Sequence, residues 1–149
     1  MAQVKEYLSE LTLTKNQLEK MYRAQYEAYK YVKGISNQNT FLSVLNSTST
    51  ILGLLFFLPT PVQVLNAFVS LTTSLIPSQK ETLLKCLSNG RDFLDESKMF
   101  MEDFPQFDQI RLMTPFLEYV SEGVRLVSGQ GEITAAHTNN GWVSPGGGN

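Results

Sequence analysis

Residues 34–79 read GISNQNTFLSVLNSTSTILGLLFFLPTPVQVLNAFVSLTTSLIPSQ, and these 46 residues contain no Asp, Glu, Lys, Arg or His. Charged residues make up 17% of the whole chain, against about 25% in an ordinary domain. At the chain's own average, an uncharged window of this length arises by chance on the order of once in 10⁴. Such a segment is buried in a core, in a subunit interface or in lipid.

Charge lies outside this block and differs between its two flanks. Residues 1–33 carry six Lys or Arg and four Glu, whereas residues 80–149 carry six Lys or Arg and ten Asp or Glu. The net charge of −2 offers no basic surface for phosphate contacts, so we expect no nucleic-acid partner. One Cys and one His exclude a disulfide framework and a Cys- or His-rich metal centre. We expect neither a metal nor a cofactor.

The uncharged block predicts a helical hairpin over 41–76. Its first half becomes continuously apolar at 51–58 and ends at Pro59-Thr60-Pro61, because proline keeps the residue before it out of the helical conformation. Apolar residues then recur at helical spacing over 62–76, and the following proline closes the second half.

Helices are also predicted on both flanks. Over 2–33 the apolar residues follow a near-heptad rhythm, and the pattern T-x-x-Q at Thr14 predicts a capping box that divides this stretch into 2–11 and 15–33. Gly34 is expected to end the first helical stretch. The pattern S-x-x-E at Ser78 predicts the start of acidic helices over 79–127, the first of which should end at Asp103 or Phe104, before Pro105.

The last segment, 128–149, changes character. It holds six of the ten glycines and no helical period, and a turn signal, Asn140-Gly141, precedes the single tryptophan, Trp142. The predicted fold is therefore mainly α. A helical bundle over 1–127 is built around the central apolar hairpin, and an irregular Gly-rich C-terminal arm follows.

No enzymatic motif is present. The phosphate-binding, dinucleotide-binding, zinc-protease and serine-hydrolase patterns are all missing from the sequence. Cys86 and His137 are the only thiol–imidazole pair, and a flexible arm is a poor holder for a catalytic histidine. The carboxylates over 92–108 are interpreted as the solvated face of a helix. We expect no enzyme activity and no small-molecule substrate.

One functional alternative is insertion of the hairpin into a membrane. Lysines lie just before and just after it, as suits a hairpin whose two ends stay on one side of a bilayer. In hydropathy it is similar in outline to the hydrophobic hairpin of colicin-type pore-forming domains and to phage holins, and this resemblance implies a membrane-inserting or pore-forming protein. Its halves, 41–58 and 62–76, are shorter than the 20 or so apolar residues of a spanning helix, and both contain several amides and hydroxyls.

The favoured hypothesis is a non-enzymatic structural subunit that self-associates into a homo-oligomer or larger assembly, such as a component of a phage or another particle. Uncharged polar residues suit burial between helices, where hydroxyls and amides find partners. Residues 1–33 show no apolar secretory signal, so a cytoplasmic or particle-associated location is expected, with a membrane as the alternative. The predicted interface residues lie in the hairpin, the first helix and the arm: Leu54, Leu55, Phe56, Phe57, Tyr22, Tyr26, Tyr29 and Trp142.

Overall fold

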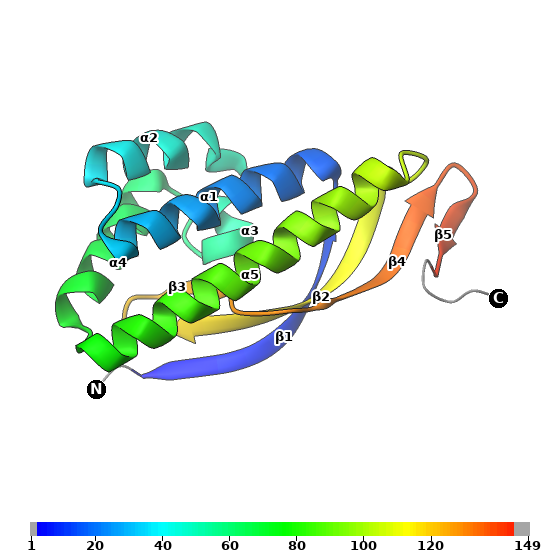
Figure 1. The fold of residues 1–149 in the computed structure, drawn as a ribbon. Helices are drawn as coiled ribbons and strands as arrows, with labels where there is room; N and C mark the ends of the chain where they lie inside the picture. The colour runs from blue at the N-terminus through cyan, green and yellow to red at the C-terminus, as the bar shows by residue number, and fades with distance from the viewer. Residues whose placement is uncertain (1–2, 145–149) are drawn as a thin grey trace.

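The computed structural model describes residues 3–144 and combines helices with an antiparallel sheet (Figure 1). In chain order the elements are β1 Val4–Leu13, α1 Lys15–Lys33, α2 Gln38–Ser47, the 3₁₀ turn η1 Ser49–Ile51, α3 Leu52–Phe56, α4 Pro61–Ser74, α5 Pro77–Asp103, β2 Gln109–Tyr119, β3 Val124–Val127, β4 Glu132–Thr138 and β5 Gly141–Val143. The mainly α helical bundle predicted from the sequence is therefore wrong. Within the described residues, a five-stranded sheet accompanies the helices, and the fold is α/β.

Strand β2 is the centre of the sheet. It pairs with β1 along its whole length, from Val4 opposite Tyr119 to Leu13 opposite Ile110. On its other side β2 pairs first with β4 and then with β3, and β5 continues the sheet beyond β4. Strand β1 is consequently an edge strand, at the lower margin of the sheet in Figure 1.

The helix predicted over 2–11 is instead strand β1. The side chains of Leu11 and Leu13 are buried and share a face with Tyr7 and Ser9, which is the period of two of a strand. Val4 and Leu8 lie on the opposite face and are exposed. Those two exposed apolar residues of an edge strand produced the spacing that resembled a helix.

The helix predicted over the end of 79–127 is also wrong, because β2 and β3 occupy that segment. Apolar residues on both faces of β2 produced a three-to-four spacing as well as a period of two. Pro115 lies inside β2 opposite Leu8, at the point where the partner of β2 changes from β4 to β3. A proline is tolerated there because its nitrogen, which carries no hydrogen, lies between the segment of β2 that pairs with β4 and the segment that pairs with β3.

The start of α1 confirms the sequence prediction, and the start of α5 does not. Thr14 and Gln17 form the predicted capping box, and Gly34 ends α1 in the left-handed conformation. Helix α5 begins at Pro77, and its N-cap is Ile76, two residues before the predicted cap Ser78. The backbone N–H of Ile76 donates to Oε1 of Gln79 at 3.1 Å. The helix then continues unbroken to Asp103.

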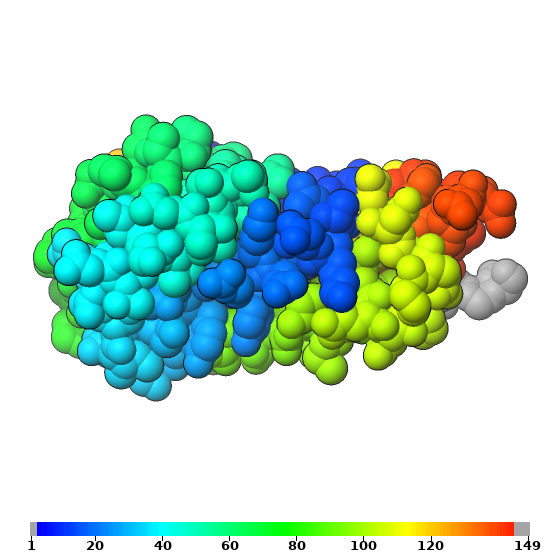
Figure 2. Space-filling model, turned by 90° about the horizontal axis from the view of Figure 1, so that it is seen from above, coloured from blue at the N-terminus to red at the C-terminus, as the bar shows by residue number. Residues whose placement is uncertain are grey.

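The predicted hairpin is present but broken into short pieces. Thr48 donates its hydroxyl to the carbonyl of Val44 at 2.8 Å where α2 ends, and α3 is only five residues long. Phe68 of α4 meets Phe41 and Phe56 edge-on at centroid distances of 5.6 and 5.4 Å. The hairpin helices therefore share a core with one another, and α2 also packs on α1. Figure 2 shows α1, α2 and the end of α5 together on one face of an elongated molecule.

The predicted irregular arm is largely regular. Residues 132–138 form β4 on the central strand, and Asn140-Gly141 turns the chain into β5, with Gly141 at a φ of 105°. Backbone pairing with β2 orders a segment whose composition alone indicated flexibility. The remaining part of the predicted arm, 145–149, lies outside the described residues.

Candidate functional site

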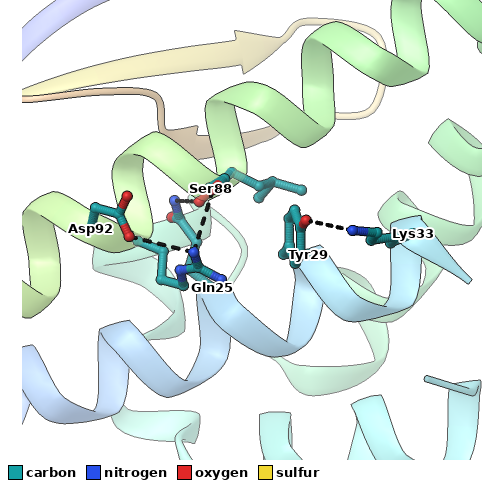
Figure 3. Close-up of polar contacts among 7 residues, drawn as sticks. Gln25, Tyr29, Lys33, Ser88 and Asp92 are labelled. Carbon is teal, nitrogen blue, oxygen red and sulfur yellow. Dashed lines mark hydrogen bonds and ion pairs between the residues drawn. The ribbon is translucent and has the colours of Figure 1, made fainter. Parts of the chain in front are cut away.

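A buried glutamine seals one edge of the sheet. The side chain of Gln25 in α1 is fully buried, and its Oε1 accepts from the backbone N–H of Val127 at 3.1 Å. Its Nε2 donates to the carbonyls of Val127 and Leu87 at 2.7 and 3.1 Å. Gln25 therefore occupies the place of a peptide group from a neighbouring strand, and it joins α1 to α5 and β3. Figure 3 shows Gln25 of α1 beside the part of α5 that carries Ser88 and Asp92.

The close approach of α5 to this edge depends on a glycine. A Cβ at Gly90 would lie 1.8 Å from the carbonyl oxygen of Val127 and 2.5 Å from Nε2 of Gln25. Gly90 therefore permits the close packing of α5 on β3.

The edge formed by β1 has no such seal. Its residues from Val4 to Glu10 are mostly exposed, and Leu8 keeps 64% of its accessible surface. No other strand pairs with this side of β1 among the described residues. An edge of this length, with free N–H and C=O groups, is a template for pairing with another strand.

A buried arginine lies on the face of the sheet beside this edge. Arg125 of β3 is only 5% exposed, and its guanidinium lies between the rings of Phe57 and Phe116 at 3.9 and 3.7 Å from their centroids. Its Nη2 donates to the carbonyl of Leu54 at 2.6 Å, and its Nη1 donates to the hydroxyl of Tyr7 at 3.3 Å. Nε of Arg125 has no hydrogen-bond partner in the described residues.

Tyr7 connects the arginine to a carboxylate. Its hydroxyl donates to Oε1 of Glu118 at 3.1 Å while accepting from Arg125. Burial raises the pKa of Tyr7, and the nearby guanidinium of Arg125 opposes that increase. The phenol is therefore held as a neutral bridge between the two charged groups.

Four predicted interface residues from the hairpin divide into two pairs. Leu55 and Phe56 are fully buried within the chain, whereas Leu54 and Phe57 are 37% and 49% exposed. Phe57 has a φ of 70°, a left-handed conformation that is rare for an aromatic residue. This conformation ends α3 and places the ring against Arg125.

An open groove of about 580 Å³ adjoins these residues. It is lined by three residues of β1, by one residue of β2 and by the residue that ends α3: Lys5, Glu6, Tyr7, Glu118 and Phe57. We call this groove, the exposed ring of Phe57 that lines it, and the free edge of β1 the β1 surface.

The three tyrosines predicted as interface residues form one half-buried row along α1: Tyr22, Tyr26 and Tyr29. Arg91 of α5 lies over two of the rings at 4.9 and 5.3 Å, and Lys98 lies over the third at 5.4 Å. Nζ of Lys33 donates to the Tyr29 hydroxyl at 3.1 Å (Figure 3). The row holds α1 against α5 within one chain, at cation–π distances.

Trp142 lies at the opposite end of the molecule from the hairpin helices, on the β4–β5 hairpin (Figure 1). It is 39% exposed, with Arg111 over its ring at 4.3 Å and the His137 ring 5.1 Å away. Nδ1 of His137 lies 2.7 Å from Oδ1 of Asp108. The structure thus brings Trp142 and the β1 surface to separate places.

Cys86 and His137 are far apart, although His137 lies in strand β4 and not in a flexible arm. Cys86 lines a cavity of about 270 Å³ together with Tyr119, whereas His137 pairs with Gln109 at the other end of β2. Ten residues of strand separate those ends by about 33 Å. Burial raises the pKa of Cys86 and raises the pKa of Tyr119 to about 12. Among residues 3–144 no group of three or more His, Cys, Asp or Glu is arranged to hold a metal ion.

No single helix in the described part of the chain is long and apolar enough to cross a membrane. The segments Ser49–Phe56 and Pro61–Ser74 meet that requirement only as a pair, with a bend of 45° between them.

No protein-family model matches the chain, and neither a curated protein nor a solved structure matches it. Its function is therefore inferred from its own residues.

The sequence did not single out Gln25 or Arg125. Gln25 is a polar residue on the apolar face of α1, between Ala24 and Ala28, and that position is a usable signal of a buried hydrogen-bonding role. Arg125 is the one charge within the apolar run of β3. Its partners come from elements distant in sequence, so no local pattern identifies them.

Proposed function

We propose that the protein is a non-enzymatic assembly subunit whose copies associate with one another through the β1 surface. The observation that carries the proposal is the long free edge of β1 with the exposed apolar ring of Phe57 in the groove beside it. The edge of β3 differs, because the side chain of Gln25 satisfies the outward backbone groups of Val127 there. No side chain does the same for β1 among the described residues, and this difference supports the proposal. Exposed apolar groups next to a free edge suit a protein partner.

The proposal is tested by the mass of the protein in solution without detergent. Light scattering or sedimentation velocity over a range of concentrations should show a dimer or a larger species that dissociates on dilution. A monomer at every concentration would contradict self-association.

Phe57→Asn probes the apolar part of the β1 surface. Asparagine tolerates the left-handed conformation at this position, so the backbone is expected to stay in place while the ring is removed. Association should weaken. Ile35→Asn is the matched control, because Ile35 is 65% exposed in the loop after α1 and away from the groove. Equal effects of the two variants would argue against a specific surface.

Trp142 is the second proposed contact, following the prediction that the C-terminal segment holds a neighbouring copy. Deleting residues 129–149 is not a clean test, because it removes strands β4 and β5 from the sheet. Trp142→Ala leaves the strands in place and should reduce the association of larger species. An unchanged mass distribution would remove Trp142 from the interface.

Membrane insertion of the hairpin is a second candidate function, favoured by the bent pair Ser49–Phe56 and Pro61–Ser74. Insertion would have to expose Leu55, Phe56 and Phe68, which are fully buried in the chain. Flotation with vesicles of neutral and anionic lipids, at neutral and acidic pH, separates the two functions. A cytoplasmic or particle-associated location, and the absence of nucleic-acid and small-molecule partners, remain predictions.

A further inference from the structure

We propose that two copies of the chain pair antiparallel through β1, joining their sheets across a two-fold axis at Tyr7. This inference rests on the proposed function and specifies its partner, a second copy, and the register of the contact.

The direction of the backbone groups in β1 follows from one hydrogen bond. The N–H of Val120 donates to the carbonyl of Gln3 at 3.0 Å, so Gln3 faces β2. Backbone groups alternate along a strand, and therefore the even-numbered residues from Val4 to Glu10 direct their N–H and C=O away from β2. The pairing of Leu8 with Pro115 agrees, because Pro115 has no N–H and its carbonyl accepts from Ser128 on the far side at 2.9 Å.

The same alternation explains how the other edge is capped at Val127. In β3 the backbone groups of Val127 point away from β2, and Gln25 satisfies both. No side chain of the described residues is recorded as bonding to the outward N–H or C=O of Val4, Glu6, Leu8 or Glu10. In a protein contact, an added extended strand pairs with the whole row of such groups at once.

Symmetry and charge exclude registers centred on Glu6 and on Leu8. Residues opposite each other across a two-fold axis must share a face, so their numbers have the same parity. If the two-fold axis passes through Leu8, Glu6 lies opposite Glu10 of the partner subunit. If the axis passes through Glu6, the two Glu6 side chains lie opposite each other. Both arrangements oppose negative charges.

A register centred on Tyr7 is preferred to one centred on Ser9 because only the former pairs all four outward residues from Val4 to Glu10 within the strand. Centring on Tyr7 places Glu6 opposite the partner's Leu8 and Lys5 opposite the partner's Ser9, with no like charges opposed. This register gives about eight backbone hydrogen bonds between the copies.

The surroundings of Tyr7 suit a position on the axis. Tyr7 lies opposite Phe116 in β2, which in turn lies opposite Val127 in β3. The Tyr7-centred dimer extends this apolar row through the partner's Tyr7 into the second sheet. The groove and the exposed ring of Phe57 lie on the same face, so they add apolar surface to the strand contact.

Two substitutions at Leu8 test the register, because each keeps the backbone unchanged. Leu8 is exposed, so neither variant removes a core contact. In the Tyr7-centred dimer position 8 faces the partner's Glu6 twice by symmetry. Leu8→Lys should tighten association and Leu8→Glu should weaken it, each by about 2- to 30-fold in the dissociation constant measured by sedimentation. Ile35→Lys and Ile35→Glu are the matched controls and should leave the constant unchanged.

A third substitution tests the edge itself. Leu8→Pro removes an outward N–H that no strand of the same chain uses, so helical circular dichroism should be retained while association is lost. Association of Leu8→Pro at wild-type strength would overturn pairing through β1.

The outcomes separate the inference from the function on which it rests. A wild-type chain that is monomeric at all concentrations overturns both. An associating wild type with no response at Leu8 leaves the assembly function standing and overturns the β1 pairing. Equal weakening by Leu8→Lys and Leu8→Glu overturns the Tyr7-centred register, because a Leu8-centred register sets like charges together in both variants.

Discussion

Replacing Gln25 gives the sharpest test of how this fold is held together. Gln25→Leu preserves the approximate volume of the side chain but removes both its donor and its acceptor. The backbone N–H and C=O of Val127 are then buried without partners, since they face away from β2. Each unsatisfied buried group costs about 1–3 kcal/mol, so we expect a loss of about 2–6 kcal/mol of unfolding free energy. Because a domain has a total stability of about 5–15 kcal/mol, the variant should be close to unfolding.

The measurement is urea denaturation followed by circular dichroism, at one fixed protein concentration because association shifts the apparent stability. Gln38→Leu is the matched control: Gln38 is exposed at the start of α2, and the same substitution there should change stability by less than about 0.5 kcal/mol. If Gln25→Leu lowers the free energy of unfolding no more than Gln38→Leu does, the side chain of Gln25 does not replace the hydrogen bonds of a neighbouring strand.

Gln25→Glu adds a pH-dependent version of the same test. A carboxylate still accepts from the Val127 N–H, but it places an unpaired charge beside the carbonyls of Val127 and Leu87. Burial without a cation raises the pKa of this carboxyl in the folded state above its unfolded value, and so the folded state binds the extra proton. The variant should therefore be closest to wild type near pH 4 and lose stability as the pH rises to 7. A stability difference independent of pH would contradict this reasoning.

Gly90→Ala should lower the free energy of unfolding, measured in urea, by about 1–3 kcal/mol, because the added Cβ meets the Val127 carbonyl. Gly53 has no neighbour within 4 Å of such a Cβ, so Gly53→Ala should be neutral or stabilising by up to about 1 kcal/mol. Equal effects of the two variants would contradict the close approach of α5 to β3. Burial raises the pKa of Tyr119 to about 12, so the folded state keeps a proton that the unfolded chain releases above pH 10, and stability falls as the pH rises toward 12. Between pH 9 and 12 the free energy of unfolding of Tyr119→Phe should therefore fall by about 2–3 kcal/mol less than that of the wild type. Identical decreases would show that the pKa of Tyr119 is not raised in the folded state. The pKa of Cys86 is also raised by burial, so iodoacetamide should alkylate it several-fold more slowly at pH 8 than after unfolding in urea, and equal rates would show an accessible thiolate.

Local signals in the sequence located several element ends correctly. The capping box at Thr14 and the glycine at position 34 bound α1, and α5 ends at Asp103 just before the proline at position 105. These signals work because caps and left-handed glycines satisfy backbone groups within a few residues. The Asn140-Gly141 turn was recognised for the same reason, although the strands that it joins were not.

The strands were missed because their periodicity depends on what covers each face. In β1 the exposed Leu8 and Val4 obscured the period of two, and in β2 both faces are apolar. The sequence predicted burial of the whole uncharged block, but more than half of its residues are exposed, and only the inward faces of its short helices are buried, at residues such as Phe41, Phe56 and Phe68. The side chains that cover these faces include those of α1 and the sheet, which no local pattern specifies.

By itself, the sequence determined the ends of α1, the end of α5, the turn at Asn140-Gly141 and the absence of a recognisable enzymatic motif. Only the tertiary structure decided which groups are paired and which are free: Gln25 closes one sheet edge, Arg125 is buried beside Tyr7, and the edge of β1 is left open. The reason is physical. Caps and turns are satisfied by neighbours along the chain, whereas a strand edge is satisfied or left open by residues about 100 positions away.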